Sequence, residues 1–171
     1  MKYQIVFLAF LLIACSSEPR IPSPIITIDK TFFKDGDVEI VFENDTQNGI
    51  NIIFMGDAYL HEDLGMTFGK YRKLAIDNIN ALFQTSPFSE YTEHFNAYIV
   101  YVKSNSDLIN SEINDTAFGS ILTYGGPNIT NYQNLDLYTS KVTNYSRTNK
   151  ELILMSVNNT GKGSASYNGG L

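Results

Sequence analysis

The sequence predicts an α/β fold in which a mostly parallel sheet is covered by helices and preceded by a β-hairpin. Three apolar, β-branched segments are predicted to be buried strands, at residues 50–55, 97–102 and 152–157. Helical patterns at residues 62–83 and 131–147 alternate with these strands. This alternation is typical of parallel pairing, because each crossover brings the chain back to the same edge of the sheet. A length of 171 residues suits one domain.

The first residues predict an export signal and a lipid anchor. Met1-Lys2 gives a positive start, and the apolar run from Ile5 to Ala14 is shorter than the ~20 residues that span a bilayer. Leu12-Ile13-Ala14-Cys15 resembles the lipobox of bacterial lipoproteins. Residues 1–14 are therefore predicted to be a lipoprotein signal peptide and Cys15 the lipidated residue. The alternative is an ordinary signal peptide in which this cysteine is incidental.

Residues 15–24 are polar and proline-rich, which predicts a tether between the lipid on Cys15 and the folded part. The expected location is the cell envelope, at the outer membrane or cell surface, with the membrane as a partner through the lipid. Acyl chains hold a protein at a membrane because each buried CH₂ contributes ~0.8 kcal/mol.

Turn signals divide the folded part into two regions. Residues 25–49 are predicted to be an N-terminal β-hairpin region, with strands at 25–33 and 38–42 around the Asp35-Gly36 turn. Asn48-Gly49 is the strongest two-residue hairpin signal of the chain. Residues 50–171 are predicted to form the α/β domain. The nearly continuous apolar run 50–55 indicates a strand covered on both faces.

Composition excludes several classes of function. The net charge is −6 and no run of basic residues occurs, whereas nucleic-acid binding requires clustered Lys and Arg, so we expect no nucleic-acid partner. Cys15 is the single cysteine of the chain, which excludes an intramolecular disulfide and a thiolate zinc site.

The sequence contains no complete catalytic or metal site. Its two histidines are His61 and His94, and His61-Glu62-Asp63-Leu64-Gly65 departs from H-E-x-x-H at its fifth residue. His61 is expected at a helix start and His94 as a half-buried packing residue. We therefore predict no catalytic residue, no metal ligand and no cofactor in this chain.

Three weaker candidate sites remain. Gly56 and Asp57 follow a predicted strand, where ligands bind in parallel sheets; Asp57 could equally bond the backbone amides of a loop. Asp35, Asp37 and Glu39 are acidic but lack the full pattern of a calcium loop. Asp115-Thr116-Ala117 resembles a short O-glycosylation signal of some exported bacterial proteins.

Several segments together resemble the bacterial IgA-peptidase family of zinc metallopeptidases. They are Asn51-Ile52-Ile53-Phe54-Met55-Gly56-Asp57-Ala58-Tyr59, Pro87-Phe88-Ser89-Glu90-Tyr91, Phe95-Asn96-Ala97-Tyr98-Ile99-Val100 with the following Ser104, Leu152–Asn158, and Asn168-Gly169-Gly170. The resemblance covers roughly residues 50–171. One departure is Ala58, where the family prefers glycine.

This resemblance implies a zincin-like catalytic domain cut short before its active-site helix. The family's H-E-x-x-H helix and further zinc ligands lie downstream of the matched segments, so no catalytic residue carries over, and zinc is expected only if a C-terminal part exists. Asn168, Gly169 and Gly170, with the strand 152–157, would then border a cleft for a protein or peptide substrate.

Two hypotheses follow. In the first, the chain is the N-terminal portion of a cell-envelope zinc metalloendopeptidase and is itself inactive. In the second, it is a non-catalytic surface lipoprotein that binds protein or glycan, a role that its 11 tyrosines permit because tyrosine is enriched at interfaces.

Overall fold

The computed structural model of this chain describes residues 31–46, 48–67, 69–142, 151–158 and 164–165. These residues form strands, two α-helices and two short 3₁₀ helices. In chain order they are β1 (Val38–Glu43), β2 (Ile50–Asp57), η1 (His61–Leu64), α1 (Lys70–Phe83), η2 (Thr92–His94), β3 (Phe95–Val100), β4 (Ile121–Thr123), β5 (Gly126–Asn128), α2 (Tyr132–Thr139), β6 (Glu151–Val157) and β7 (Ser164–Ala165).

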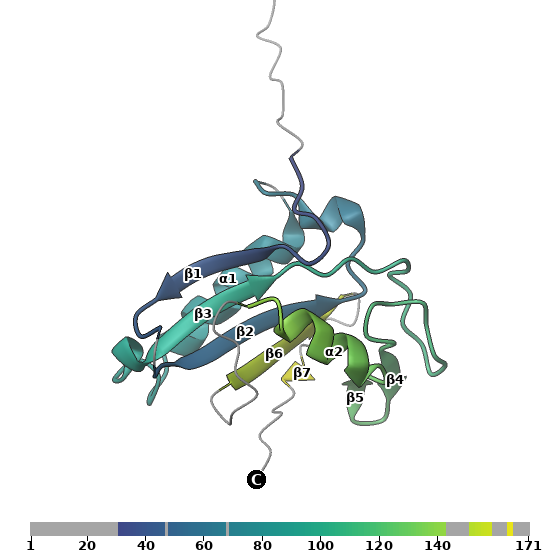
Figure 1. Cartoon of the computed structure of the whole chain (residues 1–171). Helices are drawn as coiled ribbons and strands as arrows, with labels where there is room; N and C mark the ends of the chain where they lie inside the picture. The colour runs from purple at the N-terminus through teal and green to yellow at the C-terminus, as the bar shows by residue number, and fades with distance from the viewer. Residues whose placement is uncertain (1–30, 47, 68, 143–150, 159–163, 166–171) are drawn as a thin grey trace, which may run out of the picture.

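Five of the strands form one mixed sheet in the order β1-β3-β2-β6-β7 (Figure 1). The three central strands are parallel, because β2 pairs in parallel with both β3 and β6. The outer strands β1 and β7 pair antiparallel with β3 and β6. The predicted α/β class, with its alternating order and mostly parallel core, is confirmed.

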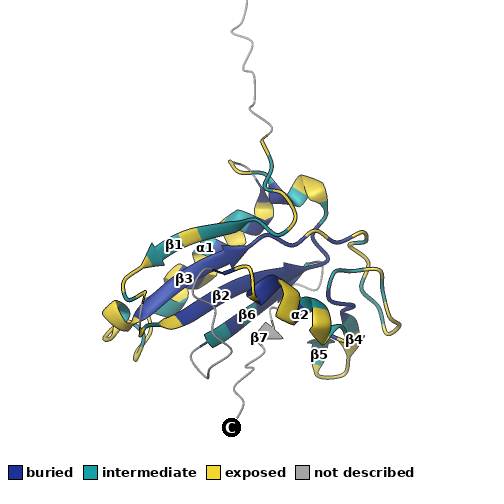
Figure 2. Ribbon diagram, viewed as in Figure 1, coloured by how far each residue is buried: buried dark blue, intermediate teal, exposed yellow. Residues whose placement is uncertain are grey.

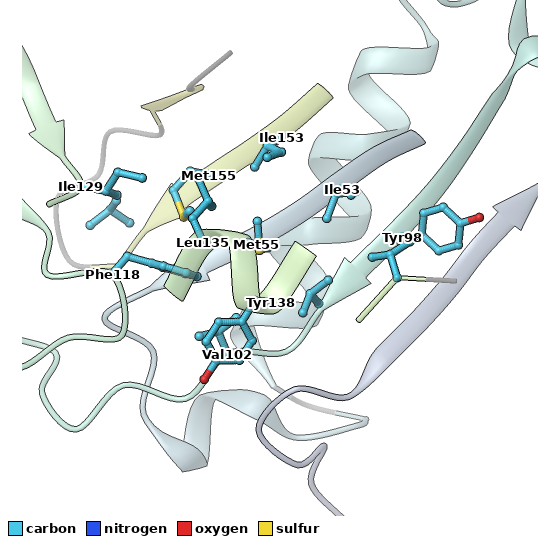
Figure 3. Packing of buried hydrophobic residues seen from close by; sticks show 13 residues of the cluster. Ile53, Met55, Tyr98, Val102, Phe118, Ile129, Leu135, Tyr138, Ile153 and Met155 are labelled. Carbon is cyan, nitrogen blue, oxygen red and sulfur yellow. The ribbon is translucent and has the colours of Figure 1, made fainter. Parts of the chain in front are cut away.

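The two helices cover opposite faces of the sheet, which explains the nearly continuous apolar run of β2 (Figure 1). On one face, α1 buries Tyr71, Ala75 and Ile79 against a cluster that includes Ile52 and Phe54. On the other face, α2 contributes Leu135 and Tyr138 to a cluster that includes Ile53, Met55, Tyr98, Phe118, Ile153 and Met155 (Figure 3). Alternate residues of β2 therefore enter different clusters, and every residue from Asn51 to Asp57 is buried (Figure 2).

The long helix predicted at residues 62–83 is wrong in its first part. The structure has η1 at 61–64, a break, and then α1 from Lys70. Gly65 is extended and forms a bridge with Phe32. A Cβ atom on Gly69 would lie 2.3 Å from the Gly65 carbonyl oxygen, so these two residues approach too closely for any side chain at position 69. Helical spacing of apolar residues alone does not predict such a close approach.

The predicted N-terminal hairpin is not what the described residues form. Asp35-Gly36 does make a turn, and Gly36 has a φ of 83°. Residues 31–33, however, bond to the loop at 64–66, and β1 pairs with β3. Residues 25–30 lie outside the described residues.

Asn48-Gly49 does not close a hairpin either, because β3 lies between β1 and β2. The Asn96 side chain of β3 holds this connection: its Oδ1 accepts from the amides of Asn44 and Asp45, and its Nδ2 donates to the Asp45 carbonyl and to Asn51. A Cβ atom on Gly49 would lie 2.3 Å from the Asp45 carbonyl oxygen. Glycine is needed here for close packing rather than for a hairpin turn.

A hairpin does form between β4 and β5, within a stretch whose sequence shows no strong period. It is followed by α2, which ends at Thr139, whereas the sequence predicted a helix over 131–147. The side chain of Asn131 accepts a hydrogen bond from the Asn134 amide and so begins the helix. Residues 143–147 lie outside the described residues.

Candidate functional site

The carboxyl ends of the three parallel strands lie at one edge of the sheet, where ligand sites of such sheets usually form. Asp57 ends β2, Ser104 lies four residues beyond β3, and Asn158 follows β6. All three are hydrogen-bonded at this edge, and Asp57 and Ser104 are buried. The candidate residues Gly56 and Asp57 lie at this edge.

The Asp57 carboxylate accepts five hydrogen bonds from protein groups. Oδ1 accepts from the Ala58 amide (2.9 Å), the Ser104 hydroxyl (3.0 Å) and the Phe118 amide (3.1 Å). Oδ2 accepts from the Thr116 hydroxyl (2.8 Å) and the Ser120 amide (3.1 Å). The side chain is completely buried. These are the contacts of a residue that organises a loop, and they occupy the lone pairs that a ligand or an abstracted proton would need.

Two hydroxyl groups complete this network. The Ser104 hydroxyl donates to Asp57 and accepts from the amides of Ala58 and Ala117. The Thr116 hydroxyl donates to Asp57 and accepts from the Ser120 amide. Thr116 is also the candidate glycosylation acceptor, and in the folded chain its hydroxyl is engaged with Asp57. We call residues 116–120 the anchored loop, since Asp57 holds both of its ends.

Gly56, the second residue of this candidate site, has a packing role. A Cβ atom there would lie 2.4 Å from Cε2 of Tyr71 and 2.7 Å from the ring of Tyr59. The glycine therefore lets both rings pack against the end of β2. Tyr71 in turn donates to the Val100 carbonyl at 2.8 Å. Burial raises the pKa of the Tyr71 hydroxyl well above its usual value.

The next residue, Ala58, has a φ of 61°, in the left-handed region that favours glycine. It is fully buried, and its amide donates both to Asp57 and to Ser104. The sharp turn directs the Asp57 carboxylate and the following backbone amide into the same network. Alanine at this position therefore adopts the left-handed turn.

A second group of contacts joins the end of β6 to the loop after β2. The Asn158 amide donates to the Asp57 carbonyl, and its side chain donates to the Ala58 carbonyl at 2.8 Å. Asp63 accepts from the Leu60 amide and pairs with Lys70 at 3.1 Å. Desolvation raises the pKa of Tyr59, whose hydroxyl shares a hydrogen bond with Ser156. These contacts fix where the chain leaves β6.

The histidines and acidic groups do not assemble a metal centre in the part of the chain that the structure describes, where no three His, Cys, Asp or Glu side chains gather. The His61 ring lies 4.5 Å from the Phe32 ring. His94 is exposed beside Glu93, so its predicted half-buried position is wrong. The described residues do not fit zinc, and we derive no chemical step through this metal.

The acidic residues of the candidate calcium loop also have separate partners. Asp35 accepts from the Tyr138 hydroxyl and the Lys103 amide. Asp37 accepts from the Lys34 amide. Glu39 pairs with Arg72 at 2.5 Å and accepts from the Tyr101 hydroxyl. Asp35 and Glu39 therefore fasten other elements to β1 and its preceding turn, whereas Asp37 closes that turn.

Several residues for which the sequence predicts a role lie outside the described residues. They are Cys15, the signal peptide, the tether, Asn168, Gly169 and Gly170. The second edge of β6 is paired with β7 at Leu154 and Met155, on the strand where a peptide substrate was expected to lie. Within the described residues, no helix has both the length and the apolar character needed to cross a membrane.

The anchored loop is the part of this edge that the sequence did not reveal. The distant donors to Asp57, at residues 104, 116, 118 and 120, sit in a polar stretch without periodicity. The one available signal was a serine shortly after the strand 97–102. Compared with known proteins, the chain matches no family model and no curated protein sequence.

Proposed function

We propose that this chain is the N-terminal portion of a cell-envelope zinc metalloendopeptidase resembling the IgA peptidases, lipid-anchored through Cys15. In this proposal it supplies the sheet framework of the enzyme and none of the described residues binds the metal. By itself the chain does not hydrolyse peptides.

One observation carries the proposal. Three of the segments that resemble the family, Asn51–Tyr59, Phe95–Val100 and Leu152–Asn158, are the three adjacent parallel strands of the sheet with their carboxyl-end turns. Residues scattered over 108 positions thus form one continuous unit.

The proposal is tested by assaying the chain alone. We expect purified protein to leave casein and IgA intact, and a metal analysis to find no stoichiometric zinc. Cleavage that a chelator suppresses would refute the proposal that the chain alone is inactive.

The coding DNA beyond the Leu171 codon, read in all three frames, is expected to encode an H-E-x-x-H motif. A protein extended through that motif should cleave casein, and replacing the glutamate of the motif by glutamine should abolish cleavage.

The lipid anchor has its own test. We expect the chain to incorporate a labelled fatty acid and to sediment with membranes, because its predicted signal ends at the only cysteine. Cys15→Ser should abolish labelling and release the protein from the membrane fraction. Equal membrane recovery of the two forms would contradict the anchor.

A non-catalytic binding module is the second candidate, and six large hydrophobic side chains that are exposed between residues 105 and 137 favour it. A self-sufficient module should unfold in one reversible transition. A portion that needs further chain should instead bind a hydrophobic dye and aggregate. The two candidates therefore differ in an observable that does not depend on enzymatic activity.

A further inference from the structure

Exposed apolar side chains are concentrated in one region of the molecule. Of the eleven large hydrophobic side chains exposed among the described residues, six lie between residues 105 and 137. Ile113 is 78% exposed and Tyr124, at the tip of the β4–β5 hairpin, is fully exposed. The six are Leu108, Ile113, Leu122, Tyr124, Tyr132 and Leu137. Soluble surfaces rarely gather such residues unless they contact a partner.

The region is one connected body rather than separate loops. The Leu122 amide donates to the Asn110 carbonyl at 2.6 Å, which joins the loop 105–115 to β4. The Asn114 side chain donates to the Ser120 carbonyl, and the Asn134 side chain of α2 donates to the Ala117 carbonyl. The hairpin, this loop and α2 lie together at one side of the molecule (Figure 1), where many residues are exposed (Figure 2). We call residues 105–137 the acidic apolar lobe.

The charge of this lobe has one sign. Residues 104–140 contain four acidic residues and no Lys, Arg or His, which is −4 of the net charge of −6. Three exposed acids each directly precede an exposed aliphatic side chain, in Asp107-Leu108, Glu112-Ile113 and Asp136-Leu137. At Asp107-Leu108 and Glu112-Ile113 the surface thus offers carboxylates and apolar groups side by side, and the nearest cations in the sequence, Lys103 and Lys141, flank the lobe.

We propose that the acidic apolar lobe binds a polypeptide segment that carries both basic and apolar side chains. Apolar contact supplies affinity, and carboxylates that face Lys or Arg supply orientation and faster association. An anionic lipid surface would be repelled by the same carboxylates. The proposal uses only described residues and does not depend on the proposed peptidase function.

The test measures binding of the full chain to three synthetic peptides. We expect a Lys/Leu peptide to bind at least about tenfold tighter than either of two others. A Glu/Leu peptide lacks the basic side chains, and a Lys/Ser peptide lacks the apolar ones. Raising salt from about 0.15 M to about 1 M shortens the Debye length from about 8 Å to about 3 Å and should weaken binding. Leu108→Ser/Ile113→Ser and Asp107→Asn/Glu112→Gln should each reduce affinity about tenfold.

Matched controls lie outside the lobe. Ile40→Ser/Leu74→Ser and Asp77→Asn/Glu93→Gln remove the same kinds of exposed side chain and should leave affinity unchanged. Equal loss in lobe and control variants would overturn the proposal, as would equal binding of the three peptides. Binding of a neutral oligosaccharide that is lost in Tyr124→Ala, without binding of the Lys/Leu peptide, would assign the lobe to glycan instead.

Discussion

Asp57 connects the end of β2 to the anchored loop, and its substitution tests that role. Asp57→Asn replaces one carboxylate oxygen by an NH₂ group, so at least two of the five donors lose their acceptor. Buried donors without partners each destabilise by about 1–3 kcal/mol, so we expect a loss of about 3 kcal/mol in the free energy of unfolding, measured in urea. Asp77→Asn, on the exposed side of α1, should change it by less than about 0.5 kcal/mol. A loss below about 1 kcal/mol in Asp57→Asn would contradict the network.

Ser104 and Ser120 are both buried serines, but only the Ser104 hydroxyl is hydrogen-bonded. The Ser104 hydroxyl makes three hydrogen bonds, whereas the Ser120 hydroxyl is the one buried side-chain polar atom of the described residues that has no partner. We expect Ser104→Ala to lower the free energy of unfolding by about 2 kcal/mol and Ser120→Ala to leave it unchanged or raise it by up to about 1 kcal/mol. A comparable loss in both variants would show that Ser120 has a bonding partner of its own.

Substitution of Ala58 by glycine tests the left-handed turn after Asp57. Replacing it with glycine relieves about 1–2 kcal/mol of backbone strain, which offsets the loss of a buried methyl group and the added chain entropy. We expect Ala58→Gly to change the free energy of unfolding by less than about 0.5 kcal/mol. Ala75→Gly, at an equally buried helical position, should lose about 2 kcal/mol. Equal losses in thermal or urea unfolding would contradict the strained turn.

At the scale of elements, three tyrosines fasten β1 and its preceding turn to the rest of the fold. Tyr138 of α2 donates to Asp35, Tyr101 after β3 donates to Glu39, and Tyr98 of β3 donates to Glu43. The acceptors recur every four residues along one segment, and each bond involves a carboxylate, which strengthens it. The edge strand is thus held by side chains as well as by its pairing with β3.

Removing these hydroxyls should loosen β1 before the rest of the sheet. We expect Tyr98→Phe, Tyr101→Phe and Tyr138→Phe each to lose about 1–2 kcal/mol, and amide exchange to quicken in β1 more than in β6. Tyr124→Phe and Tyr132→Phe, whose side chains are exposed, are the controls and should leave exchange unchanged. Uniform quickening in β1 and β6 would mean that the bonds act on global stability alone.

Some of these elements could be predicted from the sequence and others could not. The central strand β2 and the helix α1 were predictable, because two-sided burial and an apolar helical face leave periodic patterns. The position of β1 was not, because it depends on Asn96 inserting between two segments 45 or more residues earlier in the chain. Likewise Asp57 was identifiable as the end of a strand, while its distant donors are set by tertiary contacts with no local signal.

For the whole molecule, the buried tyrosines predict a sharp loss of stability at alkaline pH. Desolvation by burial, the largest cause, raises the pKa values of Tyr59, Tyr71, Tyr98, Tyr101 and Tyr138, and for Tyr98, Tyr101 and Tyr138 the carboxylate partner raises it further. In the unfolded chain these groups ionise near pH 10, whereas in the fold they remain protonated above it. The folded state therefore binds more protons at high pH, and stability falls as pH rises.

Tyr71, which is fully buried, contributes a slope of about 1.4 kcal/mol per pH unit above pH 10, and the other four tyrosines add smaller slopes because their hydroxyl groups lie closer to solvent, which screens them. Stability should therefore hold up to about pH 9 and fall as the pH rises above about 10. Urea unfolding followed by far-ultraviolet circular dichroism at a series of pH values measures the slope. Tyr101→Phe should lower that slope, because one tyrosine fewer stays protonated in the fold, and it should also lower stability at neutral pH. A slope unaltered from wild type would show that Tyr101 ionises alike in the folded and unfolded chain.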